Sequence, residues 1–282
     1  MSRTVYVNGA YVPEEEARIS IFDRAFLFGD AVYEVSAVLG GRVVDFDAHL
    51  ARLDRSLAEI ALAAPMTHGG LRELHEELIA ANELDEGIVY LQITRGVADR
   101  DFAYPTTAEP TVVAFTQSRL LIENPYVGVG VKVVTIPDIR WKRRDIKSTS
   151  MLGQCMGKEH AKLRGAYEAW MVEDGMVTEG TSSSAFIVDA EGIIRTQGLG
   201  SHILPGVTRR AILRLAQTDG VRVEERPFLV AEALAAREAF MTAASAFVLP
   251  VVEIDGTAIG DGRPGPIARQ LRRLYIEEAL AS

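Results

Sequence analysis

The chain has few of the features that mark secreted, membrane-bound or nucleic-acid-binding proteins. It has one cysteine, Cys155, which excludes an internal disulfide and fits a reducing compartment. No apolar run approaches the ~20 residues that a membrane-spanning helix needs, and the first residues lack the basic flank and apolar core of a signal peptide. Acidic residues outnumber basic ones, giving a formal net charge of −9. We therefore expect a soluble cytoplasmic protein that binds neither nucleic acid nor membranes.

The composition is that of an ordinary globular protein, with 48% hydrophobic and 24% charged residues. A length of 282 residues allows two domains, each large enough to bury its own core. A polar stretch containing Asn124-Pro125 is typical of a linker. We predict a smaller N-terminal domain over residues 1–120, a linker over 121–127 and a larger C-terminal domain over 128–282.

Local patterns predict that hairpins and helices follow one another along the chain. Asn8-Gly9 indicates a tight turn between two short strands, and Asp47 is predicted to cap a helix whose leucines share one face. Further strands are expected at 32–39, 42–46, 88–94, 111–116, 129–136, 168–172 and 185–188, and a late hairpin is expected from 248–254 and 257–259. Further helices are expected near 71–79, at 151–164, from the entry 204–208 onward and at the C-terminus. Because hairpins precede helices more often than single strands alternate with them, we expect an α+β fold with mixed sheets and packed helices.

Two residues about thirty positions apart, Lys147 and Glu179, indicate which chemistry the protein performs. Glu179 is predicted at the end of a hairpin arm and is followed by the hydroxyl-rich turn 181–184. A lysine amine can condense with the aldehyde of pyridoxal phosphate, and a carboxylate can keep the pyridine nitrogen protonated so that the ring withdraws electrons from the substrate. A free lysine has a pKa of ~10.4, so its amine must be desolvated or lie near other cations to be nucleophilic. Arg143 and Arg144 are candidates for such cations, although a solvated basic run is the simpler interpretation of them.

Five motifs occur in order along the chain: Phe28–Val35, His49–Leu53, Asp145–Ser148, Val177–Ser183 and Ile203–Arg209. In their order and spacing they resemble the fold-type IV pyridoxal-phosphate aminotransferases, and they are most similar to the bacterial D-amino-acid aminotransferases. The resemblance covers nearly the whole chain and implies a two-domain fold with pyridoxal 5'-phosphate as cofactor and no metal.

The resemblance also implies roles for individual residues. It makes Lys147 the Schiff-base lysine and Glu179 the partner of the pyridine nitrogen. Arg52 matches the phosphate anchor, since a guanidinium pairs with phosphate through two nitrogens, although a surface pair with Asp54 or Glu59 is the alternative. The remaining cofactor contacts that the resemblance implies are Val207 and Thr208 at a helix start, where free N–H groups favour an anion, Leu204 against the ring, Arg140 near the phenolic oxygen and Ala244 near the phosphate.

Substrate recognition departs from the family pattern. Tyr33 and Arg100 match residues that bind the substrate carboxylate in the D-specific enzymes, but Phe102 stands where those enzymes have a histidine. A threonine that the family usually offers near Ala244 is also missing. The resemblance implies a homodimer in which the Arg100 loop, too polar to pack within its own domain, reaches the neighbouring active site.

The sequence therefore predicts transamination between a D-amino acid and a 2-oxo acid, with pyruvate or 2-oxoglutarate as acceptor. A branched-chain L-amino-acid or (R)-amine aminotransferase is the alternative with the same fold. An aminodeoxychorismate lyase fits less well, because Tyr33 and Arg100 indicate a small amino acid. A non-catalytic relative would have no need of Lys147, Glu179 and Arg52.

Overall fold

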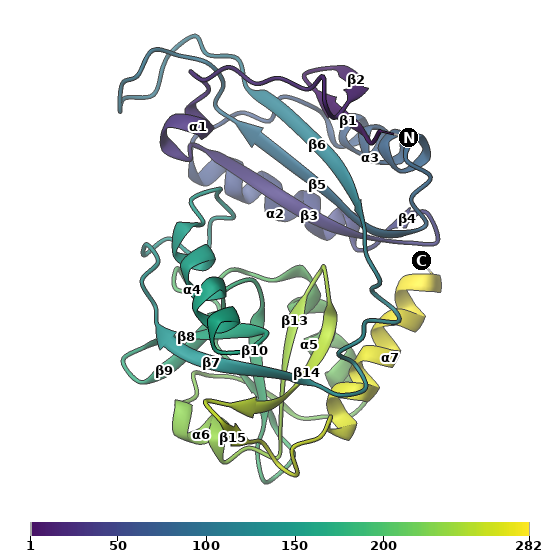
Figure 1. The fold of residues 1–282 in the computed structure, drawn as a ribbon, viewed down its shortest axis with the longest axis vertical. Coiled ribbons are helices and arrows are strands. Elements are labelled where there is room, and N and C mark those ends of the chain that lie inside the picture. The colour runs from purple at the N-terminus through teal and green to yellow at the C-terminus, as the bar shows by residue number, and fades with distance from the viewer. Residues whose placement is uncertain (1, 282) are drawn as a thin grey trace. The chain divides into compact units, whose positions relative to one another are not determined.

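The computed structural model describes residues 2–281 and divides into two compact units (Figure 1). The first unit comprises the chain up to Leu120 together with the short segment Ile146–Ser150. The second comprises Leu121–Asp145 and the chain from Met151 onward. The segment that carries Lys147 thus packs with the N-terminal part of the chain, although residues of the second unit precede and follow it.

The first unit is an antiparallel sheet with helices. Its six strands have the order β2-β1-β6-β5-β3-β4. The strands are β1 (Thr4–Val7), β2 (Ala10–Pro13), β3 (Ala31–Leu39), β4 (Arg42–Val43), β5 (Glu86–Thr94) and β6 (Thr111–Ser118), and the helices are α1 (Arg24–Phe28), α2 (Phe46–Glu59) and α3 (His68–Ala81).

Helices α2 and α3 cover one face of this sheet (Figure 1). Leu50, Leu53 and Leu57 recur at helical spacing on α2 and are buried. They pack in one cluster with alternate sheet residues such as Val32 and Leu91. Each fully buried leucine contributes roughly 1.5–3 kcal/mol, so this face anchors the strand that carries Tyr33 and Glu34.

The second unit is built around a mixed sheet of nine strands in the order β12-β11-β10-β13-β14-β7-β8-β9, with β15 paired to β14. Parallel pairs join β7 to both β8 and β14, whereas β8 and β9 form an antiparallel hairpin. The strands are β7 (Val131–Pro137), β8 (Glu168–Glu173), β9 (Met176–Gly180), β10 (Ser184–Val188), β11 (Ile194–Thr196), β12 (Val223–Glu225), β13 (Glu238–Ala243), β14 (Phe247–Ile254) and β15 (Thr257–Ala258), and the helices are α4 (Leu152–Leu163), α5 (Val207–Thr218), α6 (Val230–Leu234) and α7 (Pro266–Ala281).

The core of the second unit is apolar and closely packed. Trp170 and Phe228 meet edge to face with ring centroids 6.1 Å apart, within a cluster that joins strands β7–β10, β13 and β14. Phe186 and Phe240 stack at 4.7 Å across β10 and β13. This packing fixes the strand ends from which Glu179 and Thr242 project.

The predicted α+β class with mixed sheets is confirmed. Two details were wrong. Asp47 does not cap its helix, because α2 begins at Phe46 and Asp47 lies in its first turn, and the strand expected at 42–46 ends at Val43. The helices α1 and α6 were not predicted, because each has five residues and is too short to show a periodic apolar pattern. Within residues 2–281, no helix is long and apolar enough to cross a membrane.

The buried histidine of α3 gives a prediction about stability. His75 is 1% exposed, contacts the Leu71 carbonyl at 2.7 Å, and has a pKa lowered by burial to about 4. The unfolded chain, with an ordinary histidine pKa near ~6.5, therefore binds more protons between pH 6.5 and 4, so this group's contribution to stability falls as the pH falls through that range. Between pH 7 and 5 the loss should be about 2 kcal/mol. Replacing His75 with Gln should remove this loss of stability, measured by urea titrations at pH 7 and pH 5.

Candidate active site

Lys147 lies beside a tyrosine of the sheet in the first unit. Its Nζ is 4.1 Å from the centroid of the Tyr33 ring, and its backbone is fixed by two hydrogen bonds. The Tyr33 N–H donates to the Lys147 carbonyl at 3.0 Å, and the Lys147 N–H donates to Ser56 Oγ at 3.3 Å. Two of the residues expected at the site, Lys147 and Tyr33, are thus brought together.

Tyr33 begins a row of stacked rings on this face of the sheet. Its ring stacks on Tyr90 at 5.5 Å, and Tyr90 stacks on Phe115 at 4.8 Å. The Tyr90 hydroxyl donates to Gln92 at 2.8 Å, and burial raises its pKa well above the ordinary value. The row gives Lys147 an aromatic neighbour whose own position is held by packing.

Arg52 is buried and paired with a carboxylate that the sequence did not indicate. Its Nε and Nη2 contact the two carboxylate oxygens of Glu34 at 2.8 and 2.7 Å, and His49 Nδ1 contacts the same carboxylate at 2.8 Å. Arg52 is 8% exposed, so the alternative of a surface pair with Asp54 or Glu59 is wrong. Glu34 orients the guanidinium from strand β3, while Arg52 and His49 come from α2.

The charges in this cluster follow from burial and pairing. Burial alone would raise the pKa of Glu34, but the Arg52 guanidinium and the His49 ring lower it far below its usual range. Burial lowers the pKa of His49, although its hydrogen bond to Glu34 acts in the opposite direction. At neutral pH the cluster therefore holds one cation, Arg52, one anion, Glu34, and a neutral histidine that donates through Nδ1.

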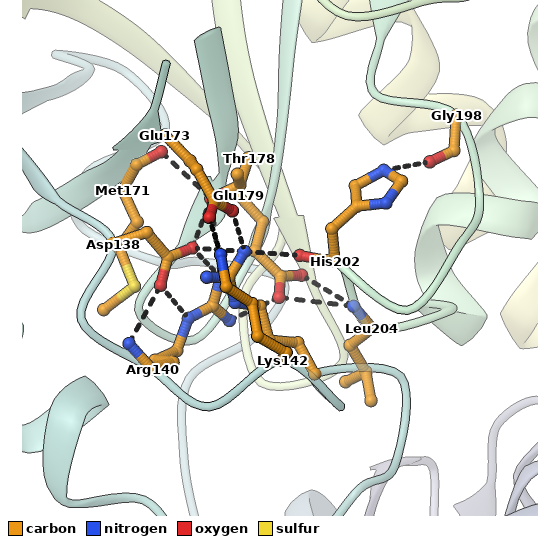
Figure 2. Close-up of polar contacts among 11 residues, drawn as sticks. Asp138, Arg140, Lys142, Met171, Glu173, Thr178, Glu179, Gly198, His202 and Leu204 are labelled. Carbon is orange, nitrogen blue, oxygen red and sulfur yellow. Dashed lines mark hydrogen bonds and ion pairs between the residues drawn. The ribbon is translucent and has the colours of Figure 1, made fainter. Parts of the chain in front are cut away.

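Glu179 is buried near the end of β9 in the second unit (Figure 2). The Leu204 N–H approaches both of its oxygens, at 3.2 and 3.1 Å, and Arg140 Nη1 contacts Oε1 at 2.5 Å. Burial raises the pKa of Glu179, and the Arg140 charge and the Leu204 hydrogen bond reduce that rise without cancelling it. Leu204 therefore fixes Glu179 through its backbone.

Arg140 belongs to a network of buried charges (Figure 2). Its Nε and Nη2 contact Asp138 at 3.0 and 2.7 Å. Arg144 contacts Asp138 at 3.2 Å and Glu173 at 2.7 Å, and its side chain is 1% exposed. The interpretation of Arg144 as part of a solvated basic run is therefore wrong. Two carboxylates pair with it and remove it from solvent.

Helix α5 begins with unsatisfied polar groups. Its first residues are Val207 and Thr208, and its N-cap is Gly206, which offers no side-chain hydrogen bond. The Thr208 hydroxyl is buried and has no hydrogen-bond partner among the described residues. The first N–H groups of a helix also lack intrahelical acceptors, so this end of α5 can bind an anion.

A second hydroxyl without a hydrogen-bond partner among the described residues belongs to Thr242 of β13. Thr242 Oγ1 is buried without a partner in the described part of the chain, and Thr242 pairs across the sheet with Ser184. A Cβ on Gly206 would come within 3.0 Å of the Ser184 hydroxyl, so the glycine leaves space beside these strands. Thr242 thus offers a hydroxyl two residues before Ala244, which lies in the turn between β13 and β14.

The Arg100 loop is held within its own unit at several points, contrary to the expectation that it is too polar to pack there. Arg24 donates to the Asp101 carbonyl at 2.6 Å, and the Arg95 guanidinium lies 3.5 Å from the centroid of the Tyr104 ring. Arg100 lies over Phe102, 5.4 Å from its centroid. Phe102 is 77% exposed, so the departure from histidine places an apolar ring on the surface of this loop.

Several residues of these clusters were missed in the sequence. Glu34 lies inside the Phe28–Val35 motif, where its carboxylate at a buried strand position was the available signal. Asp138 lies two residues before Arg140 and Thr242 lies two residues before Ala244, and neither belongs to one of the five motifs. Metal-binding groups of three or more His, Cys, Asp or Glu side chains are absent from residues 2–281.

Comparison with known proteins agrees with these features. The family model "Amino-transferase class IV" matches residues 31–254. The D-alanine aminotransferase of Staphylococcus aureus (strain MSSA476) is 38% identical over 279 residues, which cover 97% of this chain and 98% of that protein. The D-alanine aminotransferase of Bacillus licheniformis is 38% identical over 268 residues, covering 95% and 94%.

Solved structures show the same fold. A branched-chain aminotransferase from Thermoproteus uzoniensis with norvaline superposes with a TM-score of 0.90 at 26% identity, covering all of this chain and 96% of that one. A T.th. branched-chain amino acid aminotransferase complexed with N-(5'-phosphopyridoxyl)-L-glutamate gives a TM-score of 0.87 at 26% identity, covering 100% and 95%. The resemblance read from the five motifs is confirmed, and the chain belongs to the class IV aminotransferases.

Proposed function

We propose that the protein is a pyridoxal-phosphate-dependent aminotransferase that exchanges an amino group between a D-amino acid and a 2-oxo acid, with pyruvate or 2-oxoglutarate as acceptor. The observation that carries this proposal is the 38% identity, over 97% of the chain, to a protein named D-alanine aminotransferase. A cytoplasmic location belongs to the same proposal, and it is supported by the single cysteine.

The unpaired groups of the second unit fit the phosphate of such a cofactor. Buried hydroxyls normally have a hydrogen-bond partner, yet the Thr208 and Thr242 hydroxyls lack one among the described residues. The uncapped start of α5 at Val207 adds N–H donors. Phosphate oxygens would satisfy all of these donors, with backbone N–H groups at Ala244 contributing in place of the missing threonine.

The cofactor and the residues of the chain have separate roles in the proposed reaction. When bound, pyridoxal phosphate supplies an aldehyde for a lysine amine and a protonated ring that withdraws electrons from the substrate's α-carbon. Lys147 binds the cofactor covalently, and its Nζ, once released, removes the α-proton and returns it as a positioned acid and base. Tyr33, whose ring centroid lies 4.1 Å from Nζ, limits where that amine can move.

The other residues of the site bind the cofactor and orient it. Glu179 accepts the N–H of the pyridine ring, Arg52 donates to the phosphate, and the Leu204 side chain packs against the ring. Arg52 is held for this task by Glu34. The role of Arg140 near the phenolic oxygen stays a prediction, since each of its three guanidinium nitrogens already contacts a carboxylate.

Tyr33 and Arg100 bind the substrate carboxylate in this proposal, with Phe102 making the pocket less polar. We also propose a homodimer in which the Arg100 loop completes the neighbouring site. It is supported by the exposed apolar side chains at and beside the loop, Phe22, Phe26, Val97 and Phe102, each at least half exposed. A second copy of the chain would remove these side chains from water.

A branched-chain L-amino-acid aminotransferase is the second candidate. The solved structures with TM-scores of 0.87 to 0.90 and 26% identity are named branched-chain aminotransferases. The apolar Phe102, in place of a polar residue, fits a more apolar substrate. Single-substrate reactions with D- and L-amino acids separate the two candidates.

The first test uses the protein loaded with pyridoxal phosphate. Mixing it with D-alanine should remove the absorbance of the lysine-bound cofactor, whereas L-alanine and L-leucine should leave it unchanged. Lys147→Ala should abolish this absorbance band and turnover, because no other amine takes its place. Lys162→Ala, on an exposed lysine of α4, serves as the control. Normal turnover in Lys147→Ala would refute the assignment, and loss of absorbance with L-leucine alone would favour the second candidate.

The proposed phosphate site predicts that one substitution weakens cofactor binding without lowering the stability of the cofactor-free protein. Thr208→Val should weaken the binding of pyridoxal phosphate by about tenfold, because one hydrogen bond to a charged group is lost. The same change should not lower the unfolding free energy of the cofactor-free protein, because the hydroxyl it removes has no partner there. Thr218→Val, at the other end of α5, where the hydroxyl contacts the Arg214 carbonyl, is the matched control. Unchanged affinity in Thr208→Val would place the phosphate elsewhere.

The carboxylate contact predicts a difference between substrates. A charge-assisted hydrogen bond to a carboxylate is worth roughly 1.5–3 kcal/mol, so Arg100→Ala should slow amino-acid turnover by about ten- to a hundredfold. Amines without a carboxylate should be nearly unaffected. Phe102→His should improve D-alanine turnover more than amine turnover. Arg119→Ala, an exposed arginine of the same unit, should change neither, and an equal effect of Arg100→Ala on amines and amino acids would contradict the assignment.

A further inference from the structure

The guanidinium of Arg140 is divided unequally between two buried carboxylates (Figure 2). One edge, Nε and Nη2, makes two hydrogen bonds to Asp138 at 3.0 and 2.7 Å. Glu179 receives a single hydrogen bond, from Nη1. Two parallel hydrogen bonds to a carboxylate are the strongest arrangement that arginine makes, so Asp138 holds the larger share of this cation.

Asp138 is built to remain charged. Its side chain is fully buried, and it accepts further contacts from the Thr178 hydroxyl at 2.7 Å and from Arg144 at 3.2 Å. Burial would raise its pKa, but the hydrogen bonds and charges of Arg140, with Thr178 and Arg144, lower it below the ordinary value. Asp138 thus keeps a full negative charge beside Arg140 at neutral pH.

Glu179 is left with capacity to bind a second cation. In the described part of the chain, its Oε2 accepts a hydrogen bond only from the Leu204 N–H, at 3.1 Å. A carboxylate oxygen accepts two hydrogen bonds, so one site on Oε2 is open. The raised pKa of Glu179 agrees with a carboxylate whose pairing is incomplete.

A carboxylate that is fully neutralised by an arginine is a poor partner for a second cation. If Arg140 gave both nitrogens of its edge to Glu179, the attraction of Glu179 for a protonated ring nitrogen would be largely cancelled. We propose that Asp138 is a positioning residue that holds Arg140 on its own carboxylate and so keeps Glu179 available as the partner of a cationic ring nitrogen. The inference rests on the proposed role of Glu179 toward pyridoxal phosphate.

Asp138→Asn tests this role with almost no change in side-chain volume. A neutral amide releases the Arg140 cation toward Glu179, so the dissociation constant for pyridoxal phosphate should rise about ten- to a hundredfold. The first half-reaction with D-alanine should slow by a similar factor, with little change in the D-alanine concentration needed for half-saturation. Both are followed by absorbance, after circular dichroism has verified the fold.

Glu173→Gln is the matched control. It makes the same carboxylate-to-amide change in the same network, but Glu173 pairs with Arg144 and Lys142. Its cofactor affinity and half-reaction rate should stay within about twofold of the wild type. Equal losses in Glu173→Gln and Asp138→Asn would overturn the inference, because they would show a general effect of charge in the network.

A double variant separates positioning from a structural role. If Asp138 acts through Arg140, Asp138→Asn should have less than about a twofold effect on cofactor affinity in an Arg140→Leu background. A double variant that binds cofactor a further tenfold more weakly than Arg140→Leu alone would overturn the inference. This comparison holds even when Asp138→Asn alone does not fold.

The wild-type protein distinguishes failure of the inference from failure of the proposed function. Wild-type protein that forms no lysine-bound cofactor band would overturn both. Wild-type protein that forms the band and reacts with an amino acid, beside an Asp138→Asn variant with wild-type affinity and rate, would overturn the inference alone.

Discussion

Burial of charged carboxylates is the constraint on which the candidate site depends. Glu34, Asp138 and Glu179 are all removed from water, and an isolated buried charge costs several kcal/mol unless cations and hydrogen-bond donors compensate it. Compensation decides which function each carboxylate can perform. Glu34 is compensated fully by Arg52 and His49, so it is a fixed support. Glu179 is compensated in part, so it retains the capacity to bind a ligand cation.

The two arginines show the same principle from the cationic side. Arg52 uses Nε and Nη2 on Glu34, which orients its guanidinium without help from the ligand. Arg140 uses the corresponding pair of nitrogens on Asp138 and leaves Nη1 for Glu179. In each case a carboxylate supplied by a strand or its end fixes an arginine before any cofactor arrives, which reduces the ordering cost of binding.

Features set by local sequence could be predicted. The Asn8-Gly9 turn is observed with both residues at positive φ, because an asparagine–glycine pair adopts that conformation at little cost. Leu50, Leu53 and Leu57 face the core as their spacing indicates. Glu179 lies in the predicted hairpin arm, because β8 and β9 are adjacent in sequence and their turn is short. The start of α5 at Val207 likewise follows from its Pro-Gly entry.

Features set by contacts between distant residues could not be predicted. Glu34 and Arg52 are 18 residues apart, and Arg140 and Glu179 are 39 apart, so no periodic pattern links either pair. Arg144 shows the consequence most clearly. In the sequence it belongs to a basic run, which usually faces solvent. Asp138 and Glu173, at the ends of the neighbouring strands β7 and β8, remove it from water. A basic run next to a binding residue is therefore ambiguous until the carboxylates opposite it are known, because those carboxylates decide whether its charge acts on solvent or on the site.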